Sequence, residues 1–263
     1  MIIIKIGGGK SINISGIIKN LSDLHETFII VHGANALRDE LAEQLNKPKN
    51  VITSISGYSS VFSDEDALDI MMMAYSGLKN KRIVELCQQH GINAVGLTGL
   101  DGKTVSGRRN QGIRIKEGEK LRIVRDFSGK PKSINVELLN LLLTNGYVPV
   151  LTVPILDENN IAINSENDDI VRLLSKEMEA KTIIQLIEAK GFLENVNDPN
   201  SVLNKLASNK LEKMENQVDG RMKRKILALR KLFEHGAAKV IISDGRTENP
   251  IQDALAGKGT VIS

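Results

Sequence analysis

Six apolar runs recur along the chain, and they limit its possible folds more than any other feature. Continuous apolar runs rich in β-branched residues are typical of strands buried on both faces of a parallel sheet. Stretches with helical periodicity separate them, and strands that alternate with helices indicate βαβ units. We therefore predict an α/β fold with a mostly parallel sheet. The runs are Ile2 to Ile6, Phe28 to Val31, Ala94 to Leu97, Tyr147 to Val153, Thr182 to Ile187 and Val240 to Ile242.

The first run ends in a lysine and three glycines, Lys5-Ile6-Gly7-Gly8-Gly9. Glycines after a strand let backbone N–H groups approach an anion closely, so a cation held there indicates phosphate chemistry. The run does not match the two common nucleotide motifs. A Walker A loop would need glycine where Ile4 stands, and the dinucleotide fingerprint would need a small residue at Ile12. The competing interpretation is an ordinary glycine turn with Lys5 in solvent.

Composition sets the class of protein. With 263 residues, 41% of them hydrophobic, the chain can form one large domain or two lobes. No stretch approaches the roughly 20 apolar residues of a membrane span, and no signal-peptide pattern opens the sequence, so we expect a cytoplasmic protein. Cys87 is the only cysteine, and the four histidines lack zinc-site spacing. We expect any metal to arrive with the substrate.

The segment from Lys103 to Lys132 is strongly basic. Its ten basic and three acidic residues give a local charge of +7, which leaves −4 for the rest of a chain whose net charge is +3. A charge run is most often a solvated surface, but basic segments also bind nucleic acid or acidic proteins. Nucleic acid is the weaker choice, because Phe127 is the only aromatic residue of the segment.

A long amphipathic helix is predicted after Ser63. Ser63 and Asp66 have the spacing of a capping box, and the apolar stripe that follows runs towards Gly91. Such a stripe is usually core, but its exposed methionines also suit a subunit interface. The stripe consists of Leu68, Met71, Met72, Tyr75 and Leu78.

Two further segments carry candidate chemistry. The polar cluster from Asn164 to Asp169 follows a predicted strand and precedes a helix, so it is placed to line the crevice at the carboxyl ends of the sheet; a capped loop is the alternative. On the helix predicted from Gly220 to His235, Lys225 falls on the apolar face. A buried lysine needs an anionic partner, unless its stem snorkels to water.

Taken together, these motifs resemble the amino acid kinase family over essentially the whole chain. Within it, the chain is similar to the acetylglutamate kinase branch, and more closely to kinases of aminoadipate or glutamate attached to an amino-group carrier protein. The closer match lies in Val95 to Gly102 and Asp244 to Pro250. The family-level match lies in Lys5 with Gly7-Gly8, His32 to Asn35, Asn164 to Asp168, Gly220 to Lys225, Asp244 to Arg246 and Gly259-Thr260.

The resemblance implies an α/β/α sandwich with an open, mainly parallel eight-stranded sheet, and a homodimer formed through the helix near Ser63. It implies an acceptor-binding lobe over residues 1–163 and an ATP-binding lobe over residues 164–263, within one structural unit. ATP would arrive with Mg²⁺, and the partner would be an acidic carrier of the LysW type. In the family, the lysines matching Lys5 and Lys225 stabilise the transferring phosphoryl group, and the aspartate matching Asp168 orients them.

The other expected site residues fall into three groups. Acceptor binding is expected at Gly33, Ala34, Asn35, Tyr58, Ser59 and Asn164, ATP binding at Gly7, Gly8, Gly191 and Lys223, and carrier contact at Arg108, Arg109, Arg114 and Lys116.

One departure from the family pattern bears on the substrate. Acetylglutamate kinases carry an arginine for the substrate α-carboxylate, whereas the stretch from Ser56 to Phe62 holds no cation. The departure favours a protein-borne acceptor held by remote electrostatics. Free acetylglutamate as the acceptor remains the second interpretation. A catalytically silent amino-acid sensor of the same fold and a basic nucleic-acid module are interpretations from other classes.

Overall fold

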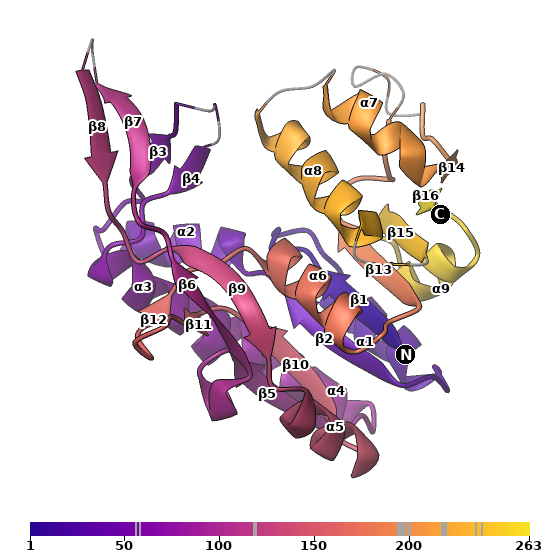
Figure 1. Cartoon of the computed structure of the whole chain (residues 1–263). Coiled ribbons are helices and arrows are strands. Elements are labelled where there is room, and N and C mark those ends of the chain that lie inside the picture. Colours follow the sequence, from indigo (N-terminus) through magenta and orange to yellow (C-terminus); the bar gives the residue numbers. More distant parts are fainter. Residues whose placement is uncertain are drawn as a thin grey trace.

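The computed structural model describes residues 1–55, 57, 59–117, 120–193, 198, 201–216, 220–234, 236–237 and 239–263, and within them it leaves out the side chains of 117, 220–222, 224 and 225. The core is one eight-stranded sheet, as expected (Figure 1). Its order is β14 (Lys205–Leu206), β16 (Thr260–Ile262), β15 (Lys239–Asp244), β13 (Thr182–Ile187), β1 (Ile2–Ile6), β2 (Phe28–His32), β10 (Val148–Thr152) and β5 (Ala94–Thr98).

The six predicted apolar runs are the six parallel strands of this sheet, from β15 to β5. β16 runs antiparallel to β15 and, with the short β14, closes one edge. β1 lies near the centre, where Lys5 is paired with Val31 of β2 and Gln185 of β13. Since parallel strands all end at the same edge of a sheet, the segments after β1, β2 and β13 converge on one side of the molecule.

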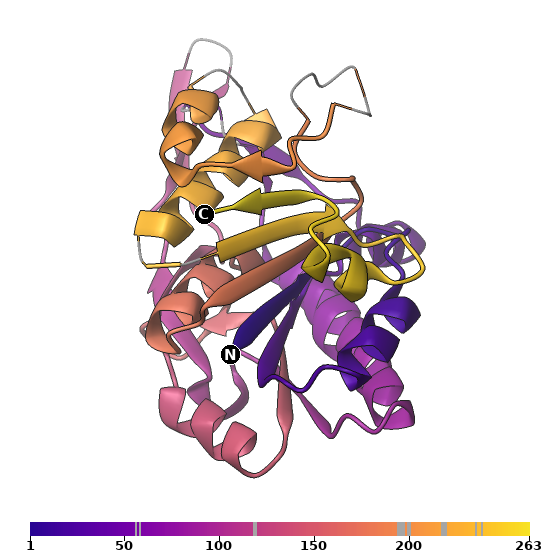
Figure 2. The same ribbon diagram turned by 90° about the vertical axis from the view of Figure 1, so that its right-hand side faces the viewer.

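Helices cover both faces of the sheet, as Figure 2 shows. Alternate residues of β1 explain this arrangement: Ile3 faces one apolar core, and Ile2, Ile4 and Ile6 face the other. The first core packs against α3 (Glu65–Met71), α5 (Val136–Thr144), α6 (Asn167–Glu177) and α8 (Gly220–Glu234). The second packs against α1 (Ile14–Ser22), α4 (Asn80–Gln89) and α9 (Pro250–Leu255).

Further helices and turns lie beyond both ends of the strands. They are α2 (Asn35–Gln44), the π-helix η1 (Met72–Lys79), the 3₁₀ turns η2 (Asp101–Lys103) and η3 (Ser208–Lys210), and α7 (Leu211–Glu215). A four-stranded sheet holds β12 (Ala162–Ile163), β11 (Ile155–Leu156), β6 (Val105–Arg109) and β9 (Gly129–Ile134). Two hairpins are formed by β3 (Val51–Thr53) with β4 (Ser59–Val61), and by β7 (Ile113–Glu117) with β8 (Lys120–Val124). No helix among the described residues is long and apolar enough to cross a membrane.

The predicted capping box at Ser63 is wrong. The long helix begins at Glu65, and its cap is Asp64, whose carboxylate accepts the N–H of Ala67. Asp and Ser are both good capping residues, so sequence alone does not choose between neighbours. The hydroxyl of Ser63 instead donates to the carbonyl of Val61 and accepts from Asn164, at 3.3 Å and 2.9 Å.

Candidate active site

Lys5 and Asp168 form an ion pair although they lie 163 positions apart in the chain. Lys5 stands on the same face of β1 as Ile3, and Asp168 is the second residue of α6, which packs on that face. The two side chains are 15% and 32% exposed, so solvent reaches the pair. A carboxylate in the first turn of a helix is also favoured by the helix dipole. The structure thus brings together two of the three predicted catalytic residues and supplies the anionic partner that Lys5 needs.

The glycine turns after β1 and β2 touch each other beside this pair. A Cβ added to Gly8 would lie 2.6 Å from the backbone nitrogen of Asn35 and 2.8 Å from that of Ala34. A Cβ added to Gly33 would lie 2.9 Å from the nitrogen of Gly8. Ala34 has φ −146° and is therefore unstrained. The two turns approach closely because Gly8 and Gly33 leave the space for it. We call Gly33-Ala34-Asn35, where acceptor binding is predicted, the acceptor turn.

The end of the first glycine turn already holds an anion. The carboxylate of Glu188, which follows β13, accepts the N–H of Ser11 at 2.6 Å. A Cβ on Gly9 would lie 2.1 Å from that carboxylate. The turn can therefore seat a negatively charged group against its backbone, as phosphate binding requires.

Asn164 is fixed by a buried polar network. Its amide nitrogen donates to the Ser63 hydroxyl at 2.9 Å, and its backbone pairs with Phe127 and Gly129. Asp126, which is only 3% exposed, accepts the Ser63 N–H at 3.1 Å and the Ser128 hydroxyl at 2.5 Å. The sequence pattern indicates Asn164 but not the Ser63–Asp126 support beneath it, because Asp126 lies within a segment whose dominant feature is its basic charge.

Of the two remaining predicted acceptor residues, the structure describes Ser59. Ser59 begins β4, and its hydroxyl lies 2.9 Å from that of Thr53. Tyr58 lies outside the described residues.

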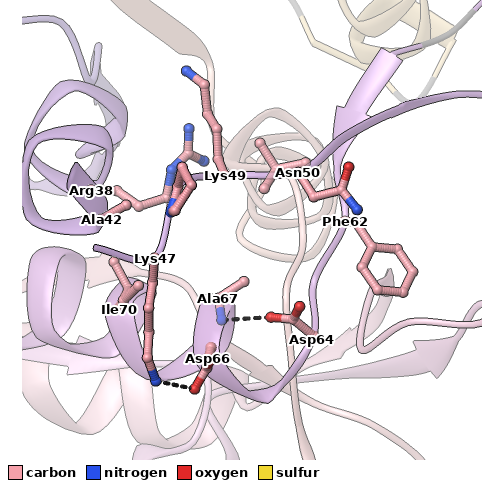
Figure 3. A pocket seen from close by; sticks show the side chains of 12 residues that line it. Arg38, Ala42, Lys47, Lys49, Asn50, Phe62, Asp64, Asp66, Ala67 and Ile70 are labelled. Carbon is pink, nitrogen blue, oxygen red and sulfur yellow. Dashed lines mark hydrogen bonds and ion pairs between the residues drawn. The ribbon is translucent and has the colours of Figure 1, made fainter. Parts of the chain in front are cut away.

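A cavity of about 150 Å³ opens between α2, the chain before β3 and the start of α3 (Figure 3). Three cations line it, and each is ion-paired: Arg38 and Lys49 with Asp39, and Lys47 with Asp66. Among the described residues that line it, the cavity therefore offers no unpaired cation in place of the arginine that the sequence from Ser56 to Phe62 lacks.

The residues predicted to bind ATP are described in part. Gly191 has φ +147° and packs against Thr260, with a Cβ at that position falling 2.7 Å from the threonine hydroxyl. Lys223 lies on α8, which packs against α6. The side chain of Lys225 lies outside the described part of the structure, so its predicted approach to Lys5 stays a prediction. Among the described residues, no cluster of His, Cys, Asp and Glu is arranged to hold a metal ion.

The basic segment folds into β6 to β9, and the β7–β8 hairpin rises beside β3–β4 (Figure 1). Of the predicted carrier contacts, Arg108, Arg114 and Lys116 are exposed. Arg109 is different: its guanidinium donates to the Asp126 carbonyl at 2.8 Å and stacks 4.0 Å from the Phe127 ring. Arg109 thus has an internal structural role that its sequence position did not show.

Known proteins share both this sequence pattern and this fold. The LysW-aminoadipate kinase of Thermus thermophilus is 38% identical over 268 residues, covering 100% of both chains. The LysW-aminoadipate/LysW-glutamate kinase of Metallosphaera sedula is 32% identical and also covers 100% of both. Among solved structures, N-acetylglutamate synthase of Neisseria gonorrhoeae matches all of this chain and 59% of its own, with a TM-score of 0.79 and 16% identity.

The model of the amino acid kinase family matches residues 1–244. This match covers most of the chain and includes Lys5, both glycine turns and Asp168. The chain therefore belongs to the amino acid kinase family.

Proposed function

We propose that this protein transfers the γ-phosphoryl group of ATP to the side-chain carboxylate of α-aminoadipate attached to a carrier protein. The observation that carries the proposal is the Lys5–Asp168 ion pair beside the two touching glycine turns. The full-length similarity to a LysW-aminoadipate kinase supports the choice of acceptor. Such an activity belongs to lysine biosynthesis, and acceptance of carrier-linked glutamate would extend it to arginine biosynthesis.

The chemistry needs little beyond positioning and charge. A carboxylate with a pKa near 4.3 is ionised at neutral pH and can attack phosphorus without a general base. Its oxygen bonds to the γ-phosphorus as the bond to the β–γ bridging oxygen breaks, giving an acyl phosphate and ADP. Lys5, oriented by Asp168, would neutralise oxygens of the transferring group. Lys225 is assigned the same task from the other lobe.

Magnesium is proposed to travel with the nucleotide. Mg²⁺ in kinases is typically held by substrate phosphates with one or two carboxylates, and it neutralises phosphate charge there. Glu188 accepts a backbone N–H at the end of the first glycine turn, and Asp168 pairs with Lys5. These two carboxylates therefore suit a Mg²⁺ ion that is brought by ATP.

The acceptor is proposed to be protein-borne because the α-carboxylate clamp is missing. We propose that the exposed cations Arg108, Arg114 and Lys116 attract an acidic carrier of the LysW type. Exposed Leu121 and Ile123 on β8 add apolar area to the β7–β8 hairpin. Binding energy gained at this remote surface would replace a pocket arginine.

The organisation of the protein is proposed on the same basis. Residues 1–163 would bind the acceptor and residues 164–263 the nucleotide. Two copies would associate as a homodimer through the helix from Glu65 to Gln89, where Met73 and Leu78 are 46% and 44% exposed. We place the enzyme in the cytoplasm, where its ATP is available.

Two alternative functions remain to be tested. N-acetylglutamate kinase activity requires recognition of a small free acid, and the ion-paired cations of the Arg38 cavity do not favour it. A silent amino-acid sensor has no need for a lysine held by a carboxylate, so the retained Lys5–Asp168 pair favours an enzyme.

A hydroxylamine trap distinguishes these functions, because acyl phosphates react with hydroxylamine to give hydroxamates. Reactions contain MgATP with carrier-linked aminoadipate, carrier-linked glutamate or free N-acetylglutamate. We expect hydroxamate with a carrier-linked acid. Product with free acetylglutamate alone would establish the second interpretation, and no product with any acceptor would favour the sensor.

A further inference from the structure

The continuous helix from Glu65 to Gln89 contains a π-helical stretch, η1. This stretch packs against α2, the helix that begins at the last residue of the acceptor turn. The backbone N–H of Asn80 donates to the carbonyl of Tyr75, five residues back instead of four. In an α-helix, side chains five positions apart point about 140° away from each other. A π-turn closes on the fifth residue and brings the two side chains towards one face of the helix. Tyr75 and Asn80 therefore face the same neighbouring structure.

Tyr75 reaches the helix side of the acceptor turn. Its hydroxyl donates to the carboxamide oxygen of Asn35, the first residue of α2. The tyrosine is 3% exposed, and burial raises its pKa to about 12. The hydroxyl therefore keeps its proton at neutral pH and stays a hydrogen-bond donor to Asn35.

Asn80 reaches the strand side of the same turn. Its amide nitrogen donates to Nε2 of His32 at 3.1 Å and to the carbonyl of Val150 at 2.9 Å. His32 is fully buried, and burial lowers its pKa to about 3, so the ring is neutral and Nε2 can accept. The other ring nitrogen lies 3.4 Å from the carbonyl of Gly33. The residue directly before the acceptor turn is thus held by the helix as well.

The sheet is shaped to admit Asn80. A Cβ on Gly96 of β5 would lie 1.9 Å from the carboxamide oxygen of Asn80, so only glycine leaves room for it. That oxygen is buried and has no hydrogen-bond partner within the described structure. An unsatisfied buried oxygen is costly, and an apolar residue would avoid the cost. An asparagine at position 80 is explained by the two hydrogen bonds that its amide nitrogen makes to His32 and Val150.

We propose that Tyr75 and Asn80 are positioning residues for phosphoryl transfer. The π-turn of η1 brings both side chains to one face of the helix, where one holds Asn35 at the end of the acceptor turn and the other holds His32 directly before its start. Tyr75 acts through Asn35, and Asn80 acts through His32. The assignment of the turn to acceptor binding rests on the proposed function, whereas the rigidity of the turn can be measured without any acceptor.

The first test is Tyr75→Phe, which removes only the hydroxyl and keeps the buried ring. We expect amide hydrogen exchange in the peptide spanning residues 32–38 to become roughly 2- to 10-fold faster, which corresponds to one lost hydrogen bond. Tyr147→Phe is the matched control: Tyr147 is 39% exposed and precedes β10, at the opposite end of the sheet, so the 32–38 peptide should exchange at its normal rate. Unchanged exchange in Tyr75→Phe would overturn the proposal.

The second test is kinetic and separates positioning from general loss of structure. Tyr75→Phe is expected to raise KM for the carrier-linked acid roughly 2- to 10-fold while KM for ATP stays within about twofold. Asn35→Ala should have a similar effect, and the double variant should be no worse than Asn35→Ala alone, because the two residues act as one unit. Effects that multiply in the double variant, or equal rises in both KM values, would contradict the proposal.

The two proposals fail in different ways. If the wild-type protein phosphorylated no acceptor while Tyr75→Phe still loosened the 32–38 peptide, the proposed function would be wrong and the fixing of the turn would stand. If phosphorylation were normal and the peptide were unchanged, only the positioning role would be lost.

Discussion

At the scale of single residues, the Lys5–Asp168 pair is the feature on which the chemistry depends. We expect Lys5→Ala to lower kcat by a factor of roughly 100 to 1,000, as for other lost electrostatic donors. The fold should survive, because Asp168 is 32% exposed and its freed carboxylate can be hydrated. Steady-state kinetics of hydroxamate formation measures the change.

Lys19→Ala is the control for that prediction, since Lys19 is an exposed lysine in the last turn of α1. It should keep near-normal turnover. Wild-type rates in Lys5→Ala would refute the assigned role, and the same measurement on Lys225→Ala would decide whether the second lysine acts in the same step.

His32 makes the stability of the fold depend on pH. Burial lowers its pKa from 6.5 to about 3, and Lys79 acts in the same direction. Between these values the unfolded chain binds a proton that the folded chain does not. The free energy of unfolding should therefore be highest above pH 6.5 and fall as the pH drops towards 3, by up to about 1.4 kcal/mol per pH unit from this residue.

Urea unfolding at several pH values tests this dependence. His25→Gln serves as the matched control, because His25 is exposed, and it should keep the slope of the wild type. A stability that did not change between pH 6.5 and 5 would contradict a buried, neutral His32.

At the scale of elements, the β7–β8 hairpin is the part of the structure proposed to bind the carrier. The double variant Arg114→Glu/Lys116→Glu should weaken carrier binding on the order of 10-fold at low salt, and by less at physiological salt, where screening already reduces the attraction. Its KM for ATP should not change. Surface plasmon resonance at two ionic strengths measures the difference.

Lys210→Glu/Lys213→Glu makes the same change of charge on η3 and α7, which lie with α8 across from the hairpin (Figure 1). This control should bind the carrier normally. Equal loss in both double variants would show that net charge matters and the hairpin does not.

The strands show how far the sequence could predict the elements. Strands inside a parallel sheet are buried on both faces, so their residues form uninterrupted apolar runs that are easy to find. The β7–β8 hairpin has a different pattern, in which Ile113 and Ile115 alternate with Arg114 and Lys116. This alternation is typical of a strand, but the high charge of the segment conceals it. β14 has two residues and carries no periodicity that could reveal it.

The candidate site was predictable to a different degree. The pairing of Lys5 with Asp168 came from resemblance, because no local pattern relates residues 163 positions apart. Tyr75 was placed in an apolar stripe, and its hydrogen bond to Asn35 depends on the π-turn, which sequence periodicity assumes to be absent. The sequence does not show hydrogen bonds made by the polar atom of a residue that otherwise packs as an apolar one, such as the hydroxyl of Tyr75.

At the scale of the whole molecule, nucleotide binding should stabilise the fold by mass action. MgATP at about 100 times its dissociation constant should add about 2.7 kcal/mol to the free energy of unfolding. For a chain of this size, that corresponds to a rise in Tm of roughly 5 to 10 °C. Differential scanning fluorimetry measures it, with adenosine at the same concentration as the control. No rise at saturating millimolar ATP would contradict an ATP-binding lobe.

The central place of β1 has a consequence for how the protein is made. Its neighbours are β2 and β13, and β13 spans residues 182 to 187. A ribosome adding about 5 to 20 residues per second would leave the β13-facing edge of the first strand without its partner for roughly 10 to 35 s. During that interval an isoleucine-rich edge can recruit strands from other nascent chains. We therefore expect a factor that shields the strand carrying Lys5 until β13 emerges to reduce aggregation of the nascent chain.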